Sequence, residues 1–167
     1  MNEVWKTIPG YEGRYEVSNW GRVLSKRTNL FIKPNLMDHG YVCVHLYSGG
    51  KHTRTVKTIH QLVAQAFIAN PFNCGEVNHK NFLRRDNRVE NLRPANDSEN
   101  RRNAKKRKNN TSGYKNVYWC NKSKKWTVIL SFNKVQKRLG TFKDLELAGL
   151  VATEARDKYH KEFANHL

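Results

Sequence analysis

The sequence predicts an α+β protein of small units, because two kinds of pattern alternate along its 167 residues. Runs rich in β-branched and aromatic residues, separated by Gly and Asn turn signals, predict short antiparallel strands. Apolar residues at helical spacing predict one helix from residue 59 and another from residue 145. A basic stretch with almost no apolar residues, 101–112, separates the patterned parts and predicts a linker.

The first 58 residues predict a β-rich module. The turn signal Asn19-Trp20-Gly21 stands between two short runs with strand character, which is a hairpin pattern. A denser run of β-branched and aromatic residues, Tyr41–Tyr47, predicts a longer strand that ends at Ser48-Gly49-Gly50. The strands expected here are 15–18, 22–25, 41–47 and a returning strand at 53–57.

A helix should follow this module. Five apolar side chains between residues 59 and 67 share one helical face, and Asn70-Pro71 should end the helix. His60 stands at the start of that apolar face. We therefore expect His60 to have a structural role, packing beside any site that the next segment forms.

A second small domain is expected from Gly113 onward. Three short strands joined by polar turns should form a sheet, over residues 113–118, 125–132 and 136–141. Asp144 is a candidate N-cap for a final helix that runs to about Phe163. The apolar stripe expected on that helix is Leu147, Ala148, Val151, Ala152, Ala155 and Tyr159.

The chain is strongly basic, with 31 Lys and Arg against 14 Asp and Glu and a net charge of +17. The net charge is +5 over 1–58, zero over 59–100, +6 over 101–112 and +6 over 113–167. A polyanion is the natural partner of such a chain, and nucleic acid is the commonest one. An anionic membrane surface would require a basic amphipathic helix with a strong apolar face or a lipidation signal, and we find neither.

The charge of the last domain is divided between its two parts. Its sheet segment, 113–142, holds seven basic residues and no acidic one, whereas 143–167 holds four basic and five acidic residues. One face of a three-stranded sheet must cover its own helix. The other face is then basic and free to meet DNA.

Other classes of protein are disfavoured. No run approaches eighteen consecutive apolar residues, so we expect no membrane-spanning segment, and the first residues lack the pattern of a secretory signal. The cysteines, Cys43, Cys74 and Cys120, are odd in number and far apart. This spacing argues against a disulfide framework and against a structural zinc site.

The segment from Glu76 to Asn100 places a histidine among amide side chains. Hydrolysis of a phosphodiester needs a base that activates water and a cation that stabilises the developing negative charge. In a hairpin followed by a helix, His79 would be the base, and Asn78 and Asn100 could bring two oxygen ligands to one divalent ion. Asn91 would fix either the loop or the histidine ring. Because adjacent strand residues point to opposite faces, Asn78 and His79 can serve one site only where the strand ends or twists.

These residues carry a resemblance to a known family. Val77-Asn78-His79, followed by the run from Asn87 to Arg93 and by Ser98-Glu99-Asn100, resembles the motif of the HNH nucleases. The preceding helix, 59–67, belongs to the same pattern, and the similarity is greatest to phage and intron-encoded homing endonucleases. Residues 5–23 resemble the NUMOD4 module that often precedes such nucleases.

The last domain resembles an AP2 DNA-binding domain. The matching residues are Gly113–Trp119, Lys125-Trp126, Leu139–Phe142 and the final helix. The order of the three parts is one that this group of endonucleases uses, and together they span nearly the whole chain.

The resemblance to HNH nucleases implies a ββα-metal fold with one divalent cation, Mg²⁺ in the first place, for which Mn²⁺ can substitute. By the family pattern His79 is the general base, Asn78 and Asn100 are the metal ligands, and Asn91 is the central Asn that holds the site together. Two departures bear on the site. Asn78 stands where Asp is common, which would weaken metal binding, and Asn81-Phe82 stands where an Asp-Gly turn is usual.

The AP2 resemblance implies that the sheet lies in the major groove of double-stranded DNA, in agreement with the charge division. We also expect the basic run to follow the DNA backbone as an arm, because phosphate contacts supply sequence-independent affinity. The predicted DNA contacts are Lys105, Lys106, Arg107, Lys115, Tyr118, Trp119, Lys124, Lys137 and Arg138.

These inferences predict a site-specific endonuclease that hydrolyses double-stranded DNA, a monomer with a dimer as the other possibility, in the cytoplasm of a bacterial or phage-infected cell. No membrane and no small-molecule substrate is expected. The expected domains are 1–58, 59–100, 101–112 and 113–167. Two alternatives stay open: a regulatory DNA-binding protein with a decayed nuclease site, and an RNA-binding protein, which an aromatic and basic sheet would permit.

Overall fold

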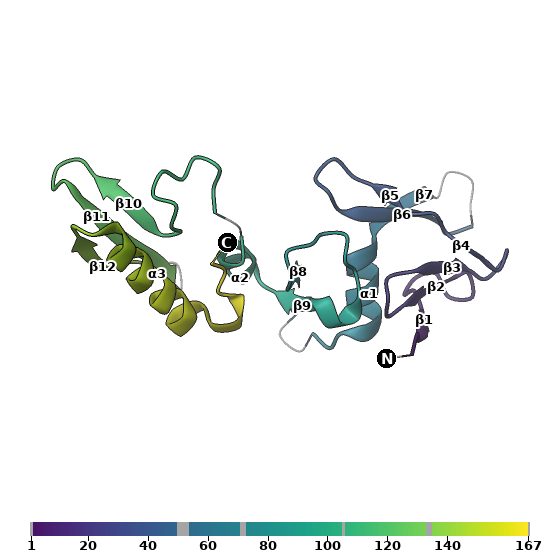
Figure 1. Ribbon diagram of the computed structural model, residues 1–167. Helices are drawn as coiled ribbons and strands as arrows, with labels where there is room; N and C mark the ends of the chain where they lie inside the picture. The colour runs from purple at the N-terminus through teal and green to yellow at the C-terminus, as the bar shows by residue number, and fades with distance from the viewer. Residues whose placement is uncertain (1, 50–53, 71–72, 105, 133–134, 167) are drawn as a thin grey trace. The chain divides into compact units, whose positions relative to one another are not determined.

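The computed structural model describes residues 2–49, 54–70, 73–104, 106–132 and 135–166 (Figure 1). The chain forms two compact units, Met1–Asn96 and Asp97–Leu167, and each has its own strands and helices. The mixed α and β content agrees with the expected class. The boundary lies at Asn96, whereas the boundaries expected from the sequence lie at residues 58, 100 and 112.

The first unit contains two small antiparallel sheets, with the strand orders β1-β2-β3-β4 and β5-β6-β7. Both predicted hairpins are present, because β2 pairs with β3 and β6 pairs with β7. The strands are β1 Trp5–Thr7, β2 Tyr15–Ser18, β3 Val23–Ser25, β4 Leu30–Phe31, β5 Asn35–Leu36, β6 Val42–Tyr47 and β7 Arg54–Thr58.

Helix α1, Ile59–Phe67, is the central element of this unit and touches strands of both sheets as well as the segment that follows it (Figure 1). Its predicted apolar face is buried in one core with residues from before position 58. That shared core is why residues 1–58 and 59–96 fold together rather than as two domains. The buried members are Ile8, Tyr11, Val17, Val23, Val44, Leu46, Ile59, Leu62, Val63 and Leu92.

The helix ends at Phe67, because Ile68 takes an extended conformation. Lys6 donates from Nζ to the carbonyl of Ala66 (3.1 Å), and its ammonium lies 4.8 Å from the Phe67 ring centroid. A cation at the C-terminal end of a helix is favourably placed against the helix dipole. Strand β1 therefore helps to fix the end of α1.

A two-stranded antiparallel hairpin completes the first unit. Strand β8, Glu76–His79, pairs with β9, Leu92–Ala95, and the short helix η1, Val89–Asn91, leads into β9. In this register Asn78 lies opposite Arg93, and His79 lies opposite Leu92.

The second unit packs one sheet against one helix. It begins with α2, Asp97–Arg102, and its antiparallel sheet has the order β10-β11-β12. Val117 and Val128 of the sheet are buried against Ala148 and Ala152 of the helix. The elements are β10 Val117–Cys120, β11 Lys125–Phe132, β12 Val135–Phe142, α3 Leu145–His160 and η2 Lys161–Phe163.

Two details of the second unit were predicted correctly and two were wrong. Asp144 caps α3, since its Oδ1 accepts the backbone N–H of Leu147 (2.7 Å), and three strands precede that helix. The first strand begins at Val117 rather than at residue 113, because Gly113 and Asn116 take positive φ angles that break an extended strand. Leu147 is 48% exposed and does not belong to the buried stripe.

No helix among the described residues is long and apolar enough to cross a membrane. Cys43, Cys74 and Cys120 are free thiols.

The first unit also buries an ionisable group, His60, in the first turn of α1. Its side chain is 7% exposed, and burial, together with the neighbouring His79, lowers the pKa of His60 to about 4. The fold therefore favours the neutral ring. Between pH 6.5 and pH 4 the unfolded chain binds a proton at this position that the folded chain does not bind.

We predict that the free energy of unfolding of the first unit falls as the pH drops from 6.5 to 4, with His60 contributing on the order of 3 kcal/mol of that loss. His60→Phe keeps an aromatic ring and removes the titration, so its free energy of unfolding should fall less steeply over this range. Urea denaturation of the full chain, followed on the methyl NMR signals of Val44 and Val63, measures the free energy of unfolding of the wild type and of the variant at each pH. The two pH slopes should coincide at pH 8, and equal slopes below pH 6.5 would contradict the assignment.

Candidate functional site

His79 is the last residue of β8 and is 5% exposed. Its Nε2 donates to Oδ1 of Asn87 at 3.3 Å. The Asn87 amide is oriented by its own Nδ2, which donates to the carbonyl of Arg85 (3.3 Å), so the oxygen faces the ring. This arrangement assigns the proton to Nε2 and leaves the lone pair on Nδ1. The strand ends at His79, which was the condition for this residue and its neighbour to serve one site.

Aromatic rings pack around His79. The His60 ring lies edge-on at 5.2 Å between centroids, and the Tyr41 ring lies at 6.0 Å. Burial lowers the pKa of His79, while the hydrogen bond to Asn87 and the charge of Asp86 oppose that shift in part. His79 is therefore neutral at pH 7, which is the state that a general base requires. His60 packs beside His79, as the sequence analysis expected.

Asn91 ties the two ends of the loop between β8 and β9 together. Its Oδ1 accepts the backbone N–H of Asn81 (2.9 Å), and its Nδ2 donates to the carbonyl of Asp86 (2.7 Å). The backbone carbonyl of Asn91 also accepts the N–H of Lys80 (2.8 Å). Of the two roles that the sequence left open for Asn91, these contacts fit the first, which is to fix the loop.

The loop forms a tight turn although it lacks the expected glycine. Phe82 takes a φ of 63°, in the left-handed region that favours glycine, and its N–H donates to the carbonyl of His79 (3.2 Å). Asn81 stabilises the turn, because its Oδ1 accepts the N–H of Leu83 and its Nδ2 donates to Asp86. The turn questioned at Asn81-Phe82 is thus made with a phenylalanine, at a cost of about 1–2 kcal/mol.

Asp86 holds the far side of the loop. Its carboxylate accepts hydrogen bonds from Arg88 (2.8 Å) and Asn81 (2.8 Å), and the Arg88 contact is the main reason that the pKa of Asp86 falls to about 2. The carboxylate is consequently ionised at any physiological pH, so this part of the loop is insensitive to titration.

Asn78 is 4% exposed, and its Oδ1 accepts a hydrogen bond from Nε of Arg93, its partner across the hairpin (3.0 Å). An amide oxygen is a suitable donor for a hard divalent cation such as Mg²⁺. Among the described residues, no group of three or more His, Cys, Asp or Glu side chains could hold a metal ion, so the candidate donors here are amides.

Asn100 lies on α2, as predicted, and is half-buried. It belongs to the second unit, whereas Asn78 belongs to the first. The pairing of these two asparagines on one ion therefore stays a prediction from the sequence motif.

Sequence reasoning missed two residues of this site. Asn87 carries the hydrogen bond to His79, and Arg93 contacts Asn78. Asn87 could have been found from the sequence, because an asparagine eight residues after the histidine lies within reach of it in one hairpin. Arg93 could be found only from the strand register, which the sequence does not contain.

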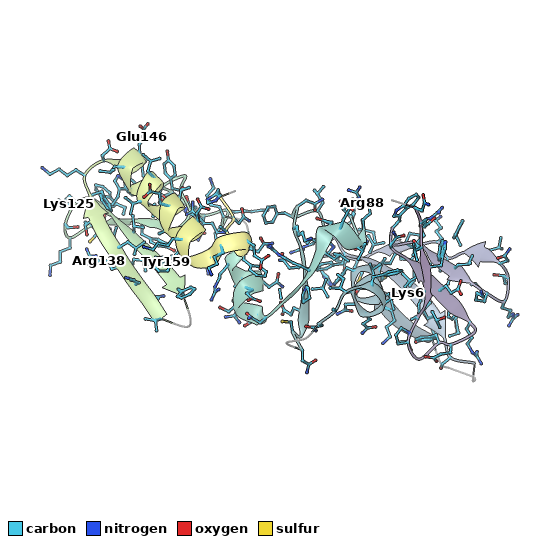
Figure 2. The ribbon with its side chains drawn as sticks, turned by 90° about the horizontal axis from the view of Figure 1, so that it is seen from below. Lys6, Arg88, Lys125, Arg138, Glu146 and Tyr159 are labelled. Carbon is cyan, nitrogen blue, oxygen red and sulfur yellow. The ribbon has the colours of Figure 1, made fainter. Side chains whose placement is uncertain are left out.

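The sheet of the second unit separates the predicted DNA contacts onto two faces. Leu130 is buried, and Lys137 pairs with it on the face that covers α3, where its Nζ lies 5.4 Å from the Tyr159 ring centroid. Arg138 pairs with Ile129 on the opposite, free face. Figure 2 labels Arg138 and Lys125 on the strands and Tyr159 on α3.

Tyr118 and Trp119 divide in the same way, because neighbouring residues of a strand point to opposite faces. Trp119 pairs with Trp126, their rings meeting edge-on at 4.9 Å, and lies on the helix side. Tyr118 pairs with Thr127 and lies on the free face, 52% exposed. Lys124 is exposed in the turn between β10 and β11. The free face thus carries Tyr118 and Arg138, together with Lys125, which the prediction omitted.

Lys115, one of the predicted DNA contacts, makes contacts within the second unit. Its Nζ donates to the backbone carbonyls of Arg102, Ala104 and Asn165, and burial lowers its pKa to about 8. These bonds hold the start of the second unit to its end, so the ammonium is used internally.

The three predicted contacts in the basic run lie in different surroundings. Lys106 donates to the carbonyl of Gly113 (2.7 Å), and Arg107 is exposed. Lys105 lies outside the described residues.

Comparison with known proteins identifies the relatives of this chain. The NUMOD4 motif matches residues 3–47. DNA endonuclease I-HmuI of Bacillus phage SP01 is 38% identical over 89 residues, which are 53% of this chain and 50% of that protein. An uncharacterized HNH endonuclease of Acanthamoeba polyphaga mimivirus, L247, is 40% identical over 103 residues, 59% of this chain and 25% of the relative.

A solved structure that describes DNA binding and cleavage by the HNH homing endonuclease I-HmuI also matches. Its TM-score is 0.55 at 35% sequence identity, and the match covers 60% of this chain and 56% of that chain. This chain spans about half the length of I-HmuI and about a quarter of the mimivirus relative. Over about half of its length the chain is therefore similar to HNH homing endonucleases, and residues 3–47 of its first unit carry a NUMOD4 motif.

Proposed function

We propose that this protein is a site-specific endonuclease that hydrolyses phosphodiester bonds in double-stranded DNA. One observation carries the proposal: a buried, neutral histidine stands at the end of β8, and Asn87 holds it in the tautomer whose Nδ1 bears the lone pair. The similarity to I-HmuI, whose solved structure concerns DNA binding and cleavage, supports the same reaction.

His79 acts as the general base in this proposal. Nδ1 takes a proton from the attacking water, and the imidazolium that results is stabilised because Nε2–H already donates to the Asn87 oxygen. Asn91 holds the loop that carries Asn87, so it keeps the histidine's partner in place. Burial holds the ring neutral until the proton arrives.

We further propose that Asn78 and Asn100 bind one divalent cation, Mg²⁺ or in its place Mn²⁺. When bound, such a cation stabilises negative charge on the scissile phosphate and on the leaving 3′ oxygen. The donor set fits a hard cation because both side chains offer amide oxygens. Both are uncharged, so the site should bind the cation more weakly than one with a carboxylate.

The second unit is proposed to grip DNA in the manner of an AP2 domain. Its free sheet face presents Tyr118, Lys125 and Arg138, an aromatic and two cations on one surface. The basic residues near Arg107 would add phosphate contacts. With a single histidine site per chain, a monomer would make one nick, and cutting both strands would require a dimer or a repositioned site.

A second function, a DNA-binding protein without cleavage, is favoured by one observation. The Asn78 oxygen already accepts a hydrogen bond from Arg93, a cation that a metal would have to tolerate close by. In that case the chain would bind DNA specifically but would not cut it, whichever divalent metal is supplied. Cleavage of any DNA by the wild-type chain excludes this alternative.

His79→Ala should lower the cleavage rate by about 10²–10⁴-fold, because a general base typically contributes a factor of that size to the rate. DNA affinity should stay nearly unchanged, because the general base does not contribute to DNA binding. Nicking of supercoiled DNA carrying a target site, with Mg²⁺, measures the rate, and gel shift without metal measures affinity. His45→Ala, which replaces a histidine outside the site, is the control and should cut normally. Normal cutting by His79→Ala would refute the mechanism.

Asn78→Asp should lower the Mg²⁺ concentration for half-maximal cleavage by roughly an order of magnitude, because a charged oxygen binds the cation more tightly. A Mg²⁺ titration of the cleavage rate checks this. Asn35→Asp adds the same charge on β5 and should leave the half-maximal concentration unchanged. Equal values for both variants would show that Asn78 is not a ligand.

Arg138→Gln should weaken DNA binding and reduce the slope of log affinity against log salt by about 1, because it removes a cation from the free sheet face. Lys137→Gln removes the same charge from the next residue, which lies on the helix side, and should change the slope less. Fluorescence anisotropy over a salt series compares them. A larger effect from Lys137→Gln would reverse the assigned faces.

A further inference from the structure

We propose that the turn between β2 and β3, within the NUMOD4 motif, positions Asn87 and, through it, His79. Gly21 and Asn19 of that turn are then positioning residues for the cleavage reaction. This inference rests on the proposed function, because it concerns the same histidine. It gives the NUMOD4 motif a part in catalysis in addition to any part in DNA binding.

The first contact is between Gly21 and Asn87. Gly21 has a φ of 81°, and a Cβ added there would lie 2.9 Å from the Cβ of Asn87 and 3.2 Å from its carbonyl oxygen. It would also lie 3.3 Å from Cγ2 of Ile59. Contacts to a Cβ and to backbone cannot be relieved by rotating a flexible side chain. Only glycine lets the turn approach Asn87 this closely.

The second contact is a hydrogen bond two residues further along. The N–H of Val89 donates to the backbone carbonyl of Asn19 at 2.8 Å. The turn therefore meets the segment 87–89 at both ends: at Asn87 by close packing and at Val89 by a hydrogen bond.

The turn is itself held firmly. The Asn19 side chain accepts the N–H of Val4 (2.8 Å) and donates to the carbonyl of Asn2 (3.1 Å). Ser18 Oγ accepts the backbone N–H groups of Trp20 (3.3 Å) and Arg22 (3.1 Å). Since these bonds fix the turn to the start of the chain and to itself, it is a rigid support rather than a loose loop.

Asn87 needs such a support. It is 5% exposed, and its amide makes the hydrogen bond that sets the tautomer and orientation of His79. Together with the loop's own bonds to Asn91 and the packing of Val89 on the core, the turn limits how far segment 87–89 can shift. A displacement of about 1 Å at a catalytic group can cost on the order of 10²-fold in rate.

The test begins with Gly21→Ala. Because the added methyl pushes on Asn87, we expect kcat for DNA nicking to fall about tenfold to 10²-fold, with KM and DNA affinity nearly unchanged. Gly10→Ala is the matched control: Gly10 has a φ of 79°, and an added Cβ there would meet nothing within 4 Å. It carries the same backbone strain without the contact, so its kcat should stay close to wild type.

A double-mutant cycle separates positioning from general destabilisation. Asn87→Ala should lower kcat by itself, and adding Gly21→Ala in that background should lower kcat no further, since the turn acts through the lost amide. The proposal is overturned if the two reductions in kcat multiply in the double variant. It is also overturned if Gly21→Ala and Gly10→Ala have the same kcat.

A second variant covers the case in which Gly21→Ala does not fold, as judged by thermal denaturation. Val89→Pro removes the N–H that donates to Asn19, at the first residue of η1, where proline suits the helix and Arg88 already has an extended ψ of 139°. It should also lower kcat in the wild-type background and not in the Asn87→Ala background. A kcat equal to wild type would overturn the proposal.

The outcome also distinguishes this proposal from the proposed function. If the wild-type chain cuts and His79→Ala does not, the function stands whatever Gly21→Ala does. If the wild-type chain cuts no DNA with any divalent metal, the function fails and takes this inference with it.

Discussion

Several parts of the first unit hold the hydrogen bond between His79 and Asn87 in place. A histidine that ends a strand could rotate freely, but here one ring nitrogen donates to an amide and the ring packs against His60 and Tyr41. The amide is held by Arg85, the loop by Asn91 and Asp86, and segment 87–89 by the turn at Gly21. Four separate parts of the first 96 residues therefore fix one imidazole.

The site shows how a strongly basic chain can keep a neutral centre. Residues 59–100 carry no net charge. Of the two charges that act on the histidine, Asp86 is paired with Arg88 on the loop, and Arg84 donates to the backbone carbonyl of His39. Burial rather than a neighbouring charge is the main cause of the lowered pKa of His79. A histidine that is neutral because it is buried is ready to accept a proton, whereas a neighbouring carboxylate would raise its pKa and increase the protonated fraction at pH 7.

The second unit shows that a single irregularity decides which cations a sheet presents. The register between β11 and β12 shifts at Val128 and Ile129, so that Val128 pairs with Gly140 while Ile129 pairs with Arg138. Without the shift, Ile129 would pair with Leu139 and the two basic neighbours on β12 would exchange faces. A bulge inverts the alternation of every residue that follows it.

Much of this protein was determined by its sequence alone, because the signals are local. The hairpin around Asn19-Trp20-Gly21, helix α1, the N-cap at Asp144 and the isolation of His79 among asparagines all depend on residues a few positions apart. Only the tertiary structure decided the rest: one core joins residues on both sides of position 58, Lys115 bonds to distant carbonyls, and Gly21 packs on Asn87. These features depend on strand register and on contacts between residues tens of positions apart. A periodic pattern gives the face that a side chain prefers, but the partner on that face is chosen by how the whole chain packs.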